Sequence, residues 1–340
     1  MSVHTLRPSS WLIVLAALLL GMVVGRTTHA QPAYEKGGVS VAGGDRLQIG
    51  GLIQTDAYFE RAEKDGFRAR STRLRLGGEA KDLQYVVQTD FSSSSVLLDA
   101  FTRLPLTERL RLTAGLFKAP FSGETLTPRP DILFAERARV VNGLSPGRQA
   151  GATLRGTLVP DRLTVTAGAF NGTPGLQSND NDFLLYAGRV DGRVPLDVGV
   201  LDVGANAAYS IDDAVTTSGR SSFAGRRLLY GVDARVKINR WLLAGELDGA
   251  ALDPEGSTDD ASPLGFYVTG GVDVTESHQV LARFDQYDPD LPAQANPDDQ
   301  VALGYNYTPS SLLRVLLNYQ APTSDLGDGF VTARLQVAIR

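Results

Sequence analysis

The 340-residue sequence contains no cysteine, which excludes a disulfide framework, a thiolate metal site and a lipid-modified cysteine anchor. It holds three histidines, and only His278 lies beyond residue 30. A hydrolase built on a serine and a histidine would have to depend on that single side chain. Acidic stretches such as residues 179–182 and 288–290 lack the full loop of a calcium-binding hand. We therefore expect no enzyme activity, no bound metal and no cofactor.

Long apolar runs are also scarce. One run, from Trp11 to Val24, follows Arg7 in a short basic start and precedes small residues at 28–30. These three regions are typical of a secretory signal peptide, and we predict cleavage after Ala30. No later run approaches the roughly 18 apolar residues that a membrane helix needs.

The sequence divides into three parts. We predict a removable signal peptide at residues 1–30, a glycine-rich lead at 31–45 and a single all-β domain at 46–340. Because the first part carries two arginines and no acid, its removal takes the formal charge from −5 to −7. A chain of this net charge is a poor partner for nucleic acid, so we expect none.

From residue 46 onwards one pattern repeats: about ten residues alternate between apolar and polar side chains, and a turn follows. Successive side chains of a strand point to opposite faces, so each predicted strand has one apolar and one polar face. The last strand shows this best, because its reverse face is almost wholly polar and its apolar face consists of Val331, Ala333, Leu335, Val337 and Ile339.

The connections between these strands alternate between short and long along the chain. We count about sixteen strands, and outer-membrane barrels have an even strand number, short periplasmic turns and longer external loops. Strands can cross the bilayer only as a closed barrel with an apolar exterior. The sequence therefore predicts a transmembrane antiparallel β-barrel in the outer membrane of a Gram-negative-type bacterium. The long loops are predicted at residues 61–66, 92–95, 119–149, 172–182, 211–225, 252–263, 288–298 and 321–327.

The third of these loops, residues 119–149, is exceptional in length. Loops of more than about 12–15 residues without structure of their own are uncommon and usually functional. This one mixes charged residues with five large apolar residues at 132–134 and 140–141, which are costly to leave in water. We therefore predict that the loop folds inward and narrows the barrel; the alternative is a mobile surface loop.

The polar faces of the strands would line a water-filled lumen. Rings of arginine or lysine favour the passage of anions, and rings of aspartate or glutamate favour cations. Both signs occur on the predicted wall, and the early arginines could serve solutes or simply pair with nearby acids. The arginines that we assign to the wall by strand periodicity include Arg73, Arg75, Arg109, Arg111 and Arg155.

Segments of the first half resemble the phosphate-selective porin O and P family, namely residues 49–59, 73–91, 114–124, 136–156 and 167–172. The resemblance implies a trimeric porin of about sixteen strands whose third loop folds into the lumen and whose basic residues attract anions, phosphate or polyphosphate in the best-known members. Carried over to the matching positions, it points to Arg73, Arg75, Lys118, Arg137, Arg139 and Arg148.

The functional expectation is a porin for passive diffusion of small hydrophilic solutes, with a preference for anions that could extend to phosphate. The expected partners are outer-membrane lipid and lipopolysaccharide, small anions such as phosphate, and two further copies of the chain. The alternatives are a nonspecific or cation-preferring porin and a soluble secreted all-β binding protein.

Overall fold

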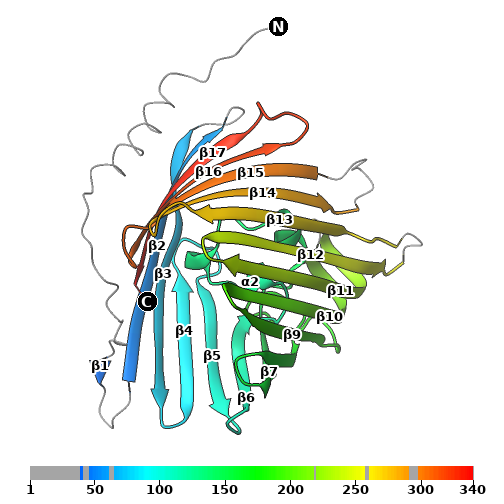
Figure 1. Ribbon diagram of the computed structural model, residues 1–340. Coiled ribbons are helices and arrows are strands. Elements are labelled where there is room, and N and C mark those ends of the chain that lie inside the picture. The colour runs from blue at the N-terminus through cyan, green and yellow to red at the C-terminus, as the bar shows by residue number, and fades with distance from the viewer. Residues whose placement is uncertain are drawn as a thin grey trace.

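The computed structural model describes residues 39–40, 46–60, 65–217, 220–256, 260–290 and 298–339, so the predicted signal peptide lies outside the described residues. Within them, sixteen antiparallel strands close into one barrel (Figure 1), and the two-residue strand β1 (Val39–Ser40) pairs with the start of β2. Closure comes from β17 pairing with β2 and from β9 pairing with β10. The predicted fold class is confirmed.

The barrel strands differ in length, and the pairs β2–β3 and β10–β11 are the longest. The strands of the first half are β2 (Arg46–Glu60), β3 (Gly66–Ala80), β4 (Leu83–Asp90), β5 (Leu97–Pro105), β6 (Leu110–Lys118), β7 (Arg148–Val159), β8 (Leu163–Phe170) and β9 (Leu185–Leu196). Those of the second half are β10 (Gly199–Thr217), β11 (Arg220–Ile238), β12 (Trp241–Pro254), β13 (Leu264–Asp273), β14 (His278–Asp288), β15 (Asp298–Tyr307), β16 (Leu313–Pro322) and β17 (Phe330–Ile339).

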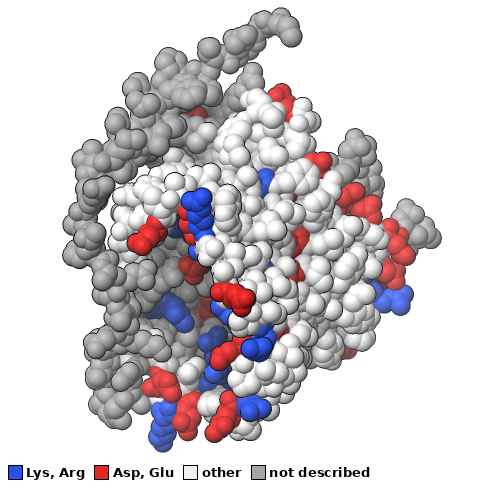
Figure 2. All heavy atoms as spheres, viewed as in Figure 1, with Lys and Arg blue, Asp and Glu red and all other residues white. Residues whose placement is uncertain are grey.

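The alternation in the sequence sorts side chains between the two faces of the barrel. On β17, Leu335 and Ile339 are about half exposed on the outer face, whereas Arg334, which directly precedes Leu335, is buried on the inner face. Figure 2 shows the same division: the surface over β13–β15 carries few charges, and charged side chains of both signs gather around the hollow end of the barrel. An apolar exterior matches lipid, and a polar interior matches water.

Short and long connections alternate as predicted, but one long loop was assigned wrongly. Residues 211–225 were expected to form an external loop, whereas β10 continues to Thr217 and β11 begins at Arg220. The hairpin continues because Asp212 on β10 and Arg227 on β11 form a buried ion pair of 2.8 Å on its inner face. β12 likewise continues to Pro254, into the loop predicted at 252–263.

The connection between β6 and β7, residues 119–147, lies inside the ring of strands (Figure 1), and we call it the inner loop. It contains α2 (Gly123–Leu126), the 3-10 helix η1 (Arg129–Asp131) and α3 (Arg139–Leu144). Its apolar side chains pack away from water in two clusters with residues of the barrel wall, and Phe134 is 1% exposed. No helix among the described residues is long and apolar enough to cross a membrane.

Candidate functional site

The inner loop is attached to the wall where β17 meets β2. Arg334 and Asp56, both fully buried on the inner face, form a two-bond ion pair with distances of 2.6 Å from Nε and 2.8 Å from the guanidinium terminus. The same guanidinium donates to the backbone oxygen of Ala135 in the loop. One arginine therefore joins two strands and the loop.

Glu136 is the acidic centre of this attachment. Its carboxylate lies 2.7 Å from Arg70 on β3, 3.1 Å from Arg334 and 3.6 Å from Arg129 of the loop. Burial alone would raise the pKa of Glu136, but the hydrogen bond from Arg70 and the surrounding arginine charges outweigh it and hold that pKa at about 2. Glu136 is therefore negatively charged at neutral pH, between arginines of β3 and β17.

Helix α2 attaches the other end of the loop to β10, β12 and β14. The side-chain oxygen of Asn206 accepts from the backbone nitrogen of Ser122, and Glu246 accepts from that of Glu124 at 3.0 Å. Arg283 donates to the carboxylate of Glu124 at 2.6 Å, with both side chains almost fully buried. These bonds hold the loop against the side of the lumen formed by the later strands.

The opposite wall, from β3 to β7, carries four arginines that have no carboxylate within ion-pair distance among the described residues. Arg111 on β6 stands directly opposite Arg155 on β7 in the strand register, an arrangement of like charges that is unfavourable unless anions or water intervene. Arg75 and Arg103 line a cavity of about 270 Å³ at the same end of the lumen. Arg75, Arg111 and Arg155 are exposed and Arg103 is half-buried. We call these four residues the arginine wall.

The sequence profile of the phosphate-selective porin O and P family matches residues 47–328. The chain belongs to this family. It is therefore a porin of the outer membrane. No curated protein matches the chain in sequence.

Solved structures of outer-membrane channels share the porin's fold at low sequence identity. A loop-deletion form of OmpT, an outer membrane protein of Vibrio cholerae, matches with a TM-score of 0.65 and 16% identity, covering 86% of this chain and 99% of that one. The outer membrane channel DcaP of Acinetobacter baumannii gives 0.64 and 13%, covering 89% and 99%. An anion-selective porin from Comamonas acidovorans gives 0.63 and 12%, covering 87% and 100%.

Of the sequence-predicted site residues, two are neutralised in this porin. Arg73 pairs with Asp90 at 2.9 Å across β3 and β4, and Arg148 makes two bonds to Asp99 of 2.9 and 3.0 Å. Each positive charge is cancelled locally by its partner, so these two residues add little to the field in the lumen.

The remaining basic residues associated with the loop have mainly structural contacts. Lys118 donates from Nζ to the backbone oxygens of Thr125 and Thr127. Arg137 donates to two backbone oxygens of the loop at 2.9 Å, so its charge is hydrogen-bonded but not cancelled. Arg139 is the first residue of α3, and its backbone nitrogen donates to Asp285.

One predicted residue is misplaced and one was missed. Arg109 was assigned to the lumen wall, but it is exposed in the short turn before β6, because the strand begins only at Leu110. Arg103 was not selected, although it shares the inner face of β5 with Asp99 and Phe101 and stacks on the Phe101 ring at 4.5 Å. The two-residue period of β5 would have identified it.

Proposed function

We propose that this porin is a general diffusion pore that prefers small anions. The observation that carries the proposal is the arginine wall, in which four positive side chains have no carboxylate partner among the described residues. In contrast, Arg73 and Arg148 on the same side of the barrel are paired with acids. A solute therefore meets uncancelled positive charge along β3–β7.

The arrangement suits passage rather than capture. Conduction requires binding that is favourable enough to admit an ion and weak enough to release it. Arg75, Arg103, Arg111 and Arg155 are distributed over four strands, and guanidinium groups bind oxyanions such as phosphate through two parallel bonds. Phosphate is thus one of the anions that we propose the pore admits. The similar fold from Comamonas acidovorans is described as an anion-selective porin.

A cation-preferring pore is the competing proposal, because the later strands carry many acids. Several of their inner-face acids are paired, however, and Glu246 and Asp248, which have no cation partner among the described residues, are buried rather than exposed to the lumen. Arg189 bonds to Asp233 at 2.7 Å and to Asp191 at 2.7 Å, and Arg283 bonds to Glu124. Paired charges contribute a weaker field than the unpaired arginine wall.

The test is the reversal potential of the reconstituted porin in a planar bilayer under a KCl gradient. We expect an anion-selective potential that moves toward cations in the double variant Arg111→Gln/Arg155→Gln. The matched control is Arg109→Gln/Arg162→Gln, which removes the same charge from exposed turns at the same end of the barrel. A cation-selective wild type, or equal shifts in both double variants, would contradict the proposal. Added phosphate should compete with chloride without abolishing the current.

We also propose that the mature porin begins after Ala30, forms a homotrimer and presents its long loops to lipopolysaccharide. One similar structure is described as the trimer form of OmpT, with a TM-score of 0.62. The N-terminal sequence of the purified protein and its migration on gels before and after boiling test the first two points. A mature N-terminus upstream of residue 31 or a monomer in mild detergent would contradict them.

A further inference from the structure

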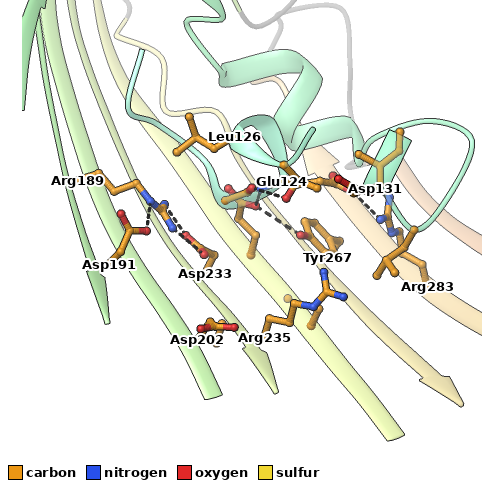
Figure 3. A pocket seen from close by; sticks show the side chains of 18 residues that line it. Glu124, Leu126, Asp131, Arg189, Asp191, Asp202, Asp233, Arg235, Tyr267 and Arg283 are labelled. Atoms are coloured by element: carbon orange, nitrogen blue, oxygen red, sulfur yellow. Dashed lines mark hydrogen bonds and ion pairs between the residues drawn. The ribbon is translucent and has the colours of Figure 1, made fainter. Parts of the chain in front are cut away.

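A cavity of about 340 Å³ lies beside α2, between the inner loop and strands β9 to β14. Figure 3 shows its charged side chains: Arg189 points at Asp191 and Asp233, while Asp202 and Arg235 lie at the far end from α2. Apolar side chains of the loop, Leu126, Ile132 and Leu133, complete the lining. The cavity is thus large enough for a small organic solute and combines apolar and charged walls.

Two of the three arginines that line the cavity are committed to its own acids. Arg189 makes bonds of 2.7 and 3.0 Å to Asp233, and Arg283 makes one of 2.6 Å to Glu124. Neither can also neutralise a further carboxylate without losing these bonds. The third, Arg235, forms no ion pair with Glu246, so that carboxylate is left without a cation among the described residues.

Glu246 is the uncompensated carboxylate on the lining. It is 4% exposed; Oε2 accepts from the backbone nitrogen of Glu124 at 3.0 Å and from the Tyr267 hydroxyl at 3.4 Å, and Oε1 has no partner. Asp248, two residues along the same face of β12, is fully buried and neither of its oxygens has a partner. No arginine or lysine lies within ion-pair distance of either carboxylate in the described residues.

A buried carboxylate without a cation is costly, and the attraction for an incoming positive charge is correspondingly strong. The same part of the chain contains no group of three or more metal-ligating side chains that could hold an ion. A compact ammonium group needs only acceptor oxygens around it, and a short alkyl chain would bury its carbons against Leu126, Ile132 and Leu133. The chemistry of the cavity therefore favours an aliphatic amine over a bare metal ion.

We propose that this cavity binds the ammonium group of a small aliphatic amine, with Glu246 as its counter-ion. Asp248, which does not line the cavity, lies behind Glu246 on the same face of β12. The site lies on the opposite side of the lumen from the arginine wall, so the porin would hold an amine on one wall while anions pass along the other. This proposal does not depend on the anion preference.

The probe is n-butylammonium chloride, which is protonated at neutral pH, added to the reconstituted full-length porin at constant chloride concentration. We expect a saturable reduction of the channel current. Glu246→Gln, which keeps an oxygen able to accept from Glu124, should raise the apparent dissociation constant at least about tenfold, because a hydrogen bond to a charged group is lost. Asp273→Asn is the control, since it removes one acid from neighbouring β13 outside the cavity lining.

Asp248→Asn provides a second variant, in case Glu246→Gln shifts α2 by weakening its hydrogen bond from Glu124. It should also weaken the effect of the amine, because the new amide keeps the shape and can donate to Glu246, so that it competes with the ammonium group for that carboxylate. The proposal would be overturned if the amine had no saturable effect on the wild type, or if uncharged n-butanol had an equal effect. It would also be overturned if MgCl₂ competed at equal concentration, or if the dissociation constant were unchanged in both variants. The reversal potential without amine tests the anion preference separately.

Discussion

Replacement of Arg334 by methionine tests whether the buried ion pair holds the barrel seam and the inner loop together. Methionine keeps most of the aliphatic volume, so the change removes charge and hydrogen bonds with little loss of packing. Arg334 and Asp56 are both 0% exposed, and removal of one partner of such a pair typically costs about 3–5 kcal/mol. Arg68 remains 3.2 Å from Asp56 but is half exposed, so it compensates only in part. We expect a loss of about 3 kcal/mol in the free energy of unfolding.

Urea titration of the detergent-folded porin measures this loss. Trp241 is the only tryptophan beyond residue 30, so its fluorescence follows the barrel alone. Arg193→Met is the matched control, because Arg193 and Asp202 form a pair with side chains 56% and 46% exposed, and exposed pairs contribute about 0–1 kcal/mol.

The reasoning would be refuted if Arg334→Met unfolded within about 1 kcal/mol of the wild type, the range expected of an exposed pair. The double variant Arg334→Met/Asp56→Asn gives an independent check. Since most of the expected cost comes from leaving Asp56 charged and alone, the second substitution should restore much of the lost stability. A double variant no more stable than the single one would mean that the contacts of Arg334 with Ala135 and Glu136 dominate.

Two further predictions concern the loop and the strands. The pKa of Glu136 is held at about 2, below its ordinary value of 4.5, so its stabilisation of the loop should be complete above about pH 4.5 and decline as the pH falls toward 2. Single-channel noise recorded against pH should rise only in that interval, and an onset near pH 6 would show that another group is responsible. Gly115 on β6 has φ of +130°, and a Cβ there would overlap the backbone oxygen of Ala100. In urea titrations, Gly115→Ala should therefore lower the free energy of unfolding by at least about 2 kcal/mol. The control Gly156→Ala, with nothing near its Cβ position, should lower it by less than about 1 kcal/mol. Equal losses in the two alanine variants would show that backbone strain at Gly115 is not the cause.

The strands of this porin could be predicted because each must present an apolar face to lipid and a polar face to water, and that demand is visible in the alternation of residues. The hairpin at residues 211–225 could not be predicted in the same way. The strands continue through this segment, and Asp212 and Arg227 pair across them. The polar composition of this segment is typical of a loop. The pairing of its side chains depends on the strand register, which the composition does not reveal.

The lumen charges show a second limit of the sequence. Arg73 and Arg75 differ by two positions and share one face, yet only Arg73 is cancelled, because the register of β3 on β4 places Asp90 opposite it. Arg148 is cancelled by Asp99 on β5, a strand that is not its neighbour in the sheet. Which charges are neutralised depends on register and barrel curvature, and neither is available from one sequence.

The net charge of the porin is a poor guide to what it admits. Ion pairs such as Arg334 with Asp56 contribute equal numbers of both signs and cancel at the scale of a permeating ion. Charges in the external loops are screened over a Debye length of about 8–10 Å, so their negative potential is weak in the lumen. Charges that lack partners inside a narrow polar channel are screened less, and on β3–β7 these include the four arginines of the arginine wall and one acid, Glu79. A chain that is acidic overall can therefore favour anions, because selectivity depends on the uncancelled charges that line the path.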